Sequence, residues 1–206
     1  AALLAWQGGM EGGCATADVL CGDTCPSGHL TDTFAENFAA YPSSAGFNDS
    51  EDYVEYRDDI YVGYRYFETI DGAADKVCYP FGYGLSYTTF AFSDAAWSVE
   101  GQAFTVQVTV TNTGDTAGRQ VAQVYCEAPQ GKLGKPHRVL VGFAKTRKLA
   151  PGESERLTIA FTARDFASYD DVGKAQASAW LLEAGDYRFC LGDNVRDAKA
   201  FGDAWT

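Results

Sequence analysis

Apolar and polar residues alternate along the second half of the chain. From Phe104 to Thr111, every second residue is phenylalanine or valine, and the residues between them are threonine or glutamine. A period of two is typical of a strand with one buried and one exposed face. Further short strands are predicted at 121–126, 138–143, 156–161 and 187–191. About seven strands, separated by turns that contain Gly or Pro, indicate a β-sandwich of the immunoglobulin or fibronectin-III kind.

The first part of the chain has a different pattern. Residues 3–6 are an apolar run, which is typical of a buried parallel strand, and glycines end it. Residues 22–28 predict a loop and residues 29–34 a short strand. Between them, residues 14–20 predict a short helix with three side chains facing inward: Ala15, Val19 and Leu20. The predicted fold class is therefore a mixed α/β remnant followed by an all-β immunoglobulin- or fibronectin-III-like sandwich.

Residues 35–78 are irregular in pattern and acidic. Between 49 and 59, six carboxylates and two tyrosines share eleven positions. We expect a solvated loop there; the alternative is a loop that reaches another domain or lines a sugar pocket. The following residues, 60–67, contain four aromatic side chains and one arginine, and we expect an aromatic strand.

An aromatic and glycine-rich segment, residues 79–90, leads into the β-rich part. Gly82 and Gly84 permit backbone angles that are closed to other residues. The segment is therefore expected to fold tightly around its own aromatic rings. We place the domain boundary within it, which gives a first domain over residues 1–85 and a second over residues 86–206.

The charge of the chain limits its partners. The formal net charge is -12, and the sequence pI is about 4.5. Such a field repels a phosphate backbone and anionic lipid, so we expect neither a nucleic acid nor a membrane as partner. No stretch approaches the roughly 20 apolar residues of a membrane-spanning helix. The first six residues lack the basic flank of a signal peptide and resemble an internal strand, so we expect a piece of a longer protein.

The cysteines and histidines do not form a metal-binding pattern. Only Cys21 and Cys25 are closely spaced, and His29 lies far from His137. We therefore expect no metal and no cofactor. Scattered cysteines are typical of small buried side chains in a reducing compartment, which favours a bacterial cytoplasmic location. The glycines of residues 8–13 lack the order of a phosphate-binding loop, and no serine lies in a nucleophile elbow.

Carboxylate pairs are the remaining candidate chemistry. Glycosidases place two carboxyl groups about 5 to 9 Å apart on either side of the scissile bond. Glu11 follows the predicted strand and begins the predicted helix, at the sheet edge where ligands tend to bind. Its ordinary role there is to interact with the N–H groups of the first helical turn. Glu11 and the preceding Gln7 are our candidates for residues adjacent to substrate, and no residue is assigned a catalytic role.

Several segments resemble glycoside hydrolase family 3. Residues 5–30 resemble the family segment G-x-E-G-G-N-A-x-A-D-V-L-F-G-D-x-N-P-S-G-x-L, and residues 60–67 and 79–88 resemble its next conserved segments. Residues 140–143, 149–153 and 183–187 resemble the fibronectin-III-like domain of the same family. This chain departs from the family pattern at three positions, where Asn, Phe and Asn are usual: Cys14, Cys21 and Cys25.

The resemblance implies a β-glucosidase-like parent that hydrolyses terminal β-linked sugars with retention. In the family, an aspartate on a (β/α)8 barrel is the nucleophile and a glutamate of the α/β sandwich is the acid/base. Neither motif is present in this sequence, so the resemblance implies a non-catalytic fragment. Its partners would be the missing barrel and, in the intact enzyme, a β-linked oligosaccharide or glycoside. Loop 49–59 and residues 60–67 would lie nearest to the barrel.

Two further expectations remain open. A fragment of this kind leaves apolar surface uncovered, and we take self-association of the fragment as a hypothesis. The alternative function is a free-standing carbohydrate-binding or structural β-sandwich module. In that module, tryptophans would stack on sugar rings: Trp6, Trp97, Trp180 and Trp205.

Overall fold

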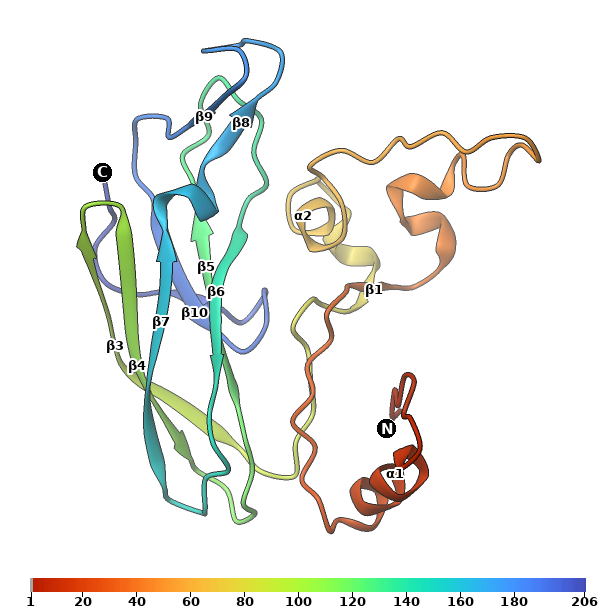
Figure 1. The fold of residues 1–206 in the computed structure, drawn as a ribbon, viewed down its shortest axis with the longest axis vertical. Helices are drawn as coiled ribbons and strands as arrows, with labels where there is room; N and C mark the ends of the chain where they lie inside the picture. Colours follow the sequence, from red (N-terminus) through yellow and green to blue (C-terminus); the bar gives the residue numbers. More distant parts are fainter. Residues whose placement is uncertain (1) are drawn as a thin grey trace.

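The structure of the protein is a computed structural model that describes residues 2–206. Most of its regular structure is β, in two antiparallel sheets (Figure 1). One sheet has the strand order β11-β10-β5-β6 and the other has the order β3-β4-β7. The strands are β3 (Phe90–Glu100), β4 (Ala103–Asn112), β5 (Val121–Glu127), β6 (Val139–Lys145), β7 (Ser154–Thr162), β10 (Arg188–Gly192) and β11 (Lys199–Ala200).

Side chains from both sheets form one hydrophobic core. Strand β4 contributes Phe104, Val106, Val108 and Val110, all of which are buried, so the alternation predicted from the sequence is confirmed. β7 pairs with β4 over its full length and contributes the same kind of alternating residues. The four other predicted strands also form, each within two residues of its predicted bounds.

Strand β3 is regular structure that the sequence pattern does not reveal. Its pairing with β4 shifts between Ser93 and Ala96, and Asp94 has a φ of 50°. A bulge of this kind turns the next side chains to the other face, so the period of two is lost within the strand. Phe92 before the bulge and Trp97 after it both pack against the core.

A small hairpin and a short helix complete the β-rich part. The hairpin pairs β8 (Ser168–Asp170) with β9 (Ala179–Leu181), and the 3-10 helix η4 (Ala163–Phe166) precedes it. η4 has a capping box in which Thr162 and Asp165 exchange hydrogen bonds. Neither element was predicted.

The part before β3 contains less regular structure. The helix α1 (Gly12–Cys21) confirms the predicted helix, and β1 (Phe34–Ala35) pairs with β2 (Val77–Tyr79). A small core forms around Phe67, with Ala40 and Ala73 beside it. The remaining helices are short: η1 (Phe38–Ala40), η2 (Pro42–Ser44), α2 (Tyr64–Phe67) and η3 (Ala74–Lys76).

The prediction of a buried strand at residues 3–6 is wrong. These residues form no strand, and Leu3, Leu4 and Trp6 are exposed. A buried parallel strand needs partner strands in the same sheet, and within residues 2–206 no strand pairs with this run. For the same reason, the apolar face of α1 covers no sheet, so Ala15 and Leu20 are exposed and Val19 is only half-buried. The predicted inward orientation of these three residues is therefore wrong.

Two other predicted strands are also wrong. In the range 29–34, only Phe34 is in a strand; instead, Leu30 exchanges backbone hydrogen bonds with Gly82 and Tyr83. Residues 60–67 form an extended loop followed by α2, which begins after Gly63 with its φ of 56°. The predicted loop at 22–28 and the exposed loop at 49–59 are confirmed. In the described range 2–206, no helix has the length and apolar character needed to cross a membrane.

Candidate functional site

The two candidate residues lie on an exposed segment that precedes α1. Gln7 and Glu11 are both exposed, and Glu11 is the N-cap residue of the helix. The Glu11 side chain makes no capping hydrogen bond, so the interaction expected with the first-turn N–H groups is not formed. An exposed carboxylate without a capping bond is not held in the fixed geometry that an acid and base pair needs.

The acidic loop at 49–59 is held by a few local contacts. Arg57 donates hydrogen bonds to Glu55 at 2.6 and 2.9 Å and to the carbonyl of Ala45 at 3.0 Å. Beneath these groups is a hollow of about 90 Å³. Sites for small ligands usually have about 300 to 1,000 Å³, so this hollow is too small to be a sugar pocket by itself.

Aromatic side chains from residues 60–67 and 79–90 pack the first part of the chain against the outer face of the four-stranded sheet. Tyr64 and Phe81 pack together there, with ring centroids 4.6 Å apart. Tyr64 also meets the buried ring of Tyr125 on β5, and its hydroxyl accepts a hydrogen bond from Leu140 N at 2.9 Å. These contacts form a second apolar cluster outside the main core. They make the two parts of the chain one packed unit at this point.

Two glycines within residues 79–90, Gly82 and Gly84, allow close approach to other parts of the chain. A Cβ at residue 84 would lie 2.5 Å from the carbonyl oxygen of Gly28, and a Cβ at residue 82 would lie 2.9 Å from Asn194 Cα. His29 reinforces the same junction, with Nδ1 2.5 Å from Gly82 O and Nε2 2.9 Å from Gln120 Oε1. Residues 79–90 are tightly packed, as expected, but they contact backbone from other parts of the chain as well as their own aromatic rings.

Two charged pairs hold the loops beside the four-stranded sheet. Lys135 pairs with Glu183, and it also donates to the carbonyl of Pro129 at 2.7 Å. Arg138 pairs with Glu127 and donates to the carbonyls of Val195 and Ala198. Each cation therefore joins segments that lie about fifty or more residues apart in the sequence. These pairs are structural ties between loops.

The shifted carboxyl pKa values support a structural role for these groups. Backbone N–H groups of residues 173–176 hold the pKa of Asp170 at about 2, with the bond from Ala175 as the largest cause. The hydrogen bond from Lys135 lowers the pKa of Glu183, and the bond from Ala150 N lowers that of Glu153. A catalytic proton donor needs a raised pKa, so these three carboxylates are unsuited to that task.

Because of Asp170, the stability of the fold is expected to decrease at acid pH. Its pKa falls from 3.8 to about 2 in the folded chain, so the ionised carboxylate stabilises the fold above about pH 4. That contribution is lost as the pH falls through about 2. Asp170→Asn should therefore lower the unfolding midpoint at pH 6, and the difference from the wild type should shrink towards pH 2. Thermal unfolding followed by circular dichroism tests this, with the exposed Asp171→Asn as the matched control. A difference that stays constant from pH 6 to pH 2 would contradict the assignment.

Two of the six cysteines are buried, three are exposed, and Cys25 is half-buried. Cys126 and Cys190 are buried, and burial raises the pKa of both thiols, that of Cys190 to about 11. These two are inert apolar side chains, as the sequence suggests. Cys14, Cys21 and Cys78 are exposed, so the expectation of burial is wrong for them. Over the described residues 2–206, no cluster of three metal-ligating side chains is present.

The tryptophans are placed differently from what a sugar-binding platform requires. Trp97 and Trp205 pack against the main core, next to Phe104. Trp180 is on β9, between Tyr169 and the guanidinium of Arg164, which lies 3.9 Å from the ring centroid. Trp6 is 74% exposed and Trp180 47%, and they lie on different segments of the chain. The four rings therefore do not form a common binding face.

Comparisons with known proteins agree with this geometry. A sequence profile of the glycosyl hydrolase family 3 C-terminal domain matches residues 1–87, and a profile of the fibronectin type III-like domain matches residues 120–195. β-Glucosidase A of Butyrivibrio fibrisolvens is 56% identical to this chain, and the match covers 96% of the chain. A β-glucosidase of Ruminococcus albus is 50% identical, over 97% of the chain. This chain belongs to glycoside hydrolase family 3.

Part of two solved β-glucosidase structures has the same fold as this chain. The Paenibacillus barengoltzii enzyme superposes with a TM-score of 0.89 at 52% identity, and the Thermotoga neapolitana enzyme 3B with a TM-score of 0.85 at 42% identity. Both matches cover 96% of this chain, but only 22% and 27% of those proteins. The chain likewise spans 26% and 21% of the Butyrivibrio and Ruminococcus enzymes. It therefore corresponds to a C-terminal domain segment and an Fn3-like domain within much longer family 3 proteins.

Proposed function

We propose that this chain is the non-catalytic, supporting part of a retaining β-glucosidase-like hydrolase. The observation that carries the proposal is its match to family 3 β-glucosidases, which covers 96–97% of the chain but no more than 27% of their length. The geometry supports it, since the strongly held carboxylates are structural and Glu11 has no fixed partner within the described residues. In the complete enzyme, the reactive groups would lie on the remaining three quarters of the protein, including the (β/α)8 barrel that the resemblance implies.

The finer assignments belong to the same proposal. The two sheets with their shared core would be a fibronectin-III-like sandwich over residues 86–206, and residues 1–85 would be the end of the α/β sandwich domain. In the complete enzyme, strands of that domain would cover the apolar run at residues 3–6 and the apolar face of α1. Glu11 and Gln7 would then lie at the edge of that domain, adjacent to substrate. The exposed apolar residues Leu3, Leu4 and Trp6 are consistent with such a covered surface.

An activity assay on the isolated chain tests the proposal. The purified chain is expected to release no nitrophenol from 4-nitrophenyl β-D-glucopyranoside above the buffer rate, because it provides neither nucleophile nor acid/base. The Ruminococcus albus β-glucosidase serves as the positive control under the same conditions. Release that increases with the concentration of the chain, and is lost in Glu11→Gln, would contradict the proposal and place a catalytic carboxylate in this chain.

A further inference from the structure

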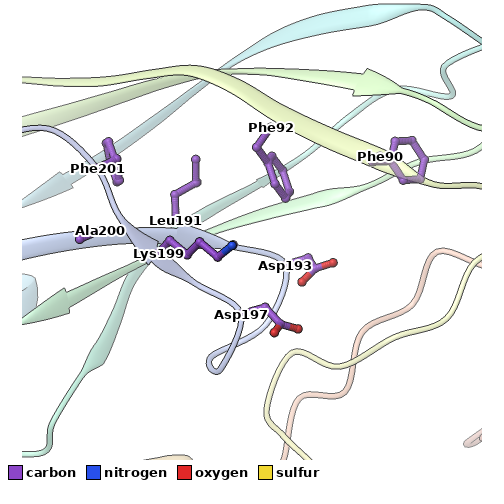
Figure 2. Close-up of a pocket in the computed structure, with 9 residues that line it drawn as sticks. Phe90, Phe92, Leu191, Asp193, Asp197, Lys199, Ala200 and Phe201 are labelled. Carbon is purple, nitrogen blue, oxygen red and sulfur yellow. The ribbon is translucent and has the colours of Figure 1, made fainter.

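A crevice lies between the edges of the two sheets. It has a volume of about 440 Å³ and opens between β3 and β11 (Figure 2). β11 is only two residues long and the β3 bulge follows Phe92, so neither edge strand closes the interior at this end. Half-buried phenylalanines from both edges form its apolar floor: Phe90, Phe92 and Phe201. The volume is within the roughly 300 to 1,000 Å³ usual for small-ligand sites.

The rim of the crevice carries polar groups in a fixed arrangement. The amide nitrogen of Asn194 donates to Asp193 Oδ1 at 2.9 Å and to Asp197 Oδ2 at 2.7 Å. Asn194 is only 5% exposed, and its own amide oxygen accepts hydrogen bonds from Arg196 N and Asp197 N at 3.0 Å. One buried amide therefore fixes both carboxylates at the mouth of the crevice. Such preorganisation lowers the entropy cost of binding a ligand there.

The rim also has groups that remain available to a ligand. Asp197 Oδ1 accepts no hydrogen bond from residues 2–206, and the ammonium group of Lys199 has no carboxylate within 4.0 Å in the same range. Lys199 extends along the crevice towards the two carboxylates (Figure 2). The mouth thus offers strong acceptors and a strong donor side by side, above aromatic rings.

The charges at the mouth restrict the kind of ligand. Two carboxylates and a protein net charge of -12 disfavour an anion. The Lys199 ammonium group offsets one of the two carboxylate charges, which weakens the attraction for a cation at this point. A neutral ligand with several hydroxyl groups can donate to the carboxylates and accept from the ammonium group, and an apolar ring face would suit the phenylalanine floor.

We infer that this crevice binds one pyranose ring of a neutral glycoside. A β-glucose unit with equatorial substituents has a flat C–H face that can pack on the phenylalanine floor. Its hydroxyl groups lie around the edge of the ring, where they can bond to the carboxylates and the ammonium group at the mouth. The inference concerns binding by the β-rich part of the chain, so it does not depend on the proposed role in a hydrolase. A chain that binds sugar without hydrolysing it satisfies both proposals, and each can fail separately.

Titration of the ¹⁵N-labelled chain with methyl β-D-glucopyranoside and cellobiose, followed by NMR, tests the inference. We expect saturable shifts confined to the amides of β3, β11 and residues 192–198, with a Kd on the order of millimolar. The double variant Asp197→Ala/Lys199→Ala should raise Kd about tenfold through the loss of two or more hydrogen bonds. Phe92→Leu keeps an apolar side chain but removes the ring, and it should also weaken binding several-fold, to an extent typical of aromatic contacts.

Matched controls separate this site from general surface effects. Asp171→Ala/Lys174→Ala removes the same charges from the exposed β8–β9 loop and should leave Kd unchanged. Mannitol, which has hydroxyls but no ring face, should bind much more weakly than the glucoside. Shifts centred on Trp6 or Trp180, tighter binding of benzylamine than of the glucoside, or no saturation with either sugar would each overturn the inference.

Discussion

Replacing Phe104 with alanine is expected to destabilise the β-rich part by about 3 to 5 kcal/mol. Phe104 is 1% exposed and lies at the centre of the core. Its ring stacks on Phe161 at a centroid distance of 5.4 Å and meets Trp205 edge-on at 5.2 Å. Truncation removes these contacts and leaves a cavity between two sheets whose backbones are held by hydrogen bonds, so the core cannot collapse fully around it.

Urea unfolding followed by tryptophan fluorescence measures this effect, because Trp97 and Trp205 adjoin the same ring. The matched control is Phe143→Ala on β6, where the side chain is 66% exposed and the loss should be no more than about 1 kcal/mol. Equal unfolding midpoints for the two variants would show that the two sheets do not share this core.

The second large effect is expected at the buried pair of Lys135 and Glu183. Lys135→Met keeps the aliphatic volume but leaves the Glu183 carboxylate without its cation and Pro129 O without its donor. Losing one partner of a buried pair costs about 3 to 5 kcal/mol. We expect about 3 kcal/mol, at the lower end of that range, because the Glu183 side chain is 14% exposed and keeps bonds from Lys132 N and Leu133 N.

Two comparisons make this result specific to the buried pair. Arg57→Met removes the cation of the exposed pair with Glu55 and should cost less than about 1 kcal/mol. The double variant Lys135→Met/Glu183→Gln removes both charges and should recover part of the loss. If Lys135→Met unfolds at the same urea concentration as Arg57→Met, the buried ion pair of Lys135 and Glu183 contributes no more to stability than the exposed pair, and the prediction is wrong.

The sequence predicts β structure well where local pattern and packing agree. Phe104 to Val110 alternate strictly, and each of these apolar residues is buried between the sheets. The pattern fails for β3, where a bulge at Asp94 changes the face of successive side chains. It also fails at residues 3–6. An apolar run can indicate a buried parallel strand, but the strand forms only where partner strands from other parts of the protein lie beside it.

The candidate site is less accessible to sequence reasoning. Glu11 could be singled out because it follows an apolar run and begins a helix, but a position at a helix start says nothing about a catalytic partner. The crevice between β3 and β11 combines Phe92 with Asp197 and Lys199, which are more than a hundred positions away. Only the packing of the two sheets, with β3 at the edge of one and β11 at the edge of the other, brings these residues together. The Asp193-Asn194 sequence and Asp197 are the local signal that could have drawn attention to the rim.

The most direct test of the account asks whether this chain can take the place of its counterpart in an active enzyme. The matching segment of Butyrivibrio fibrisolvens β-glucosidase A, which is 56% identical, would be replaced by residues 1–206, and kcat/KM measured on 4-nitrophenyl β-D-glucopyranoside. We predict a folded chimera that keeps at least about a tenth of the parent value, a loss of no more than about 1.4 kcal/mol in transition-state stabilisation. The same exchange with the Ruminococcus albus segment, which is of similar length, is the matched control. A chimera that folds but has no activity, beside an active control, would contradict a supporting role for this chain.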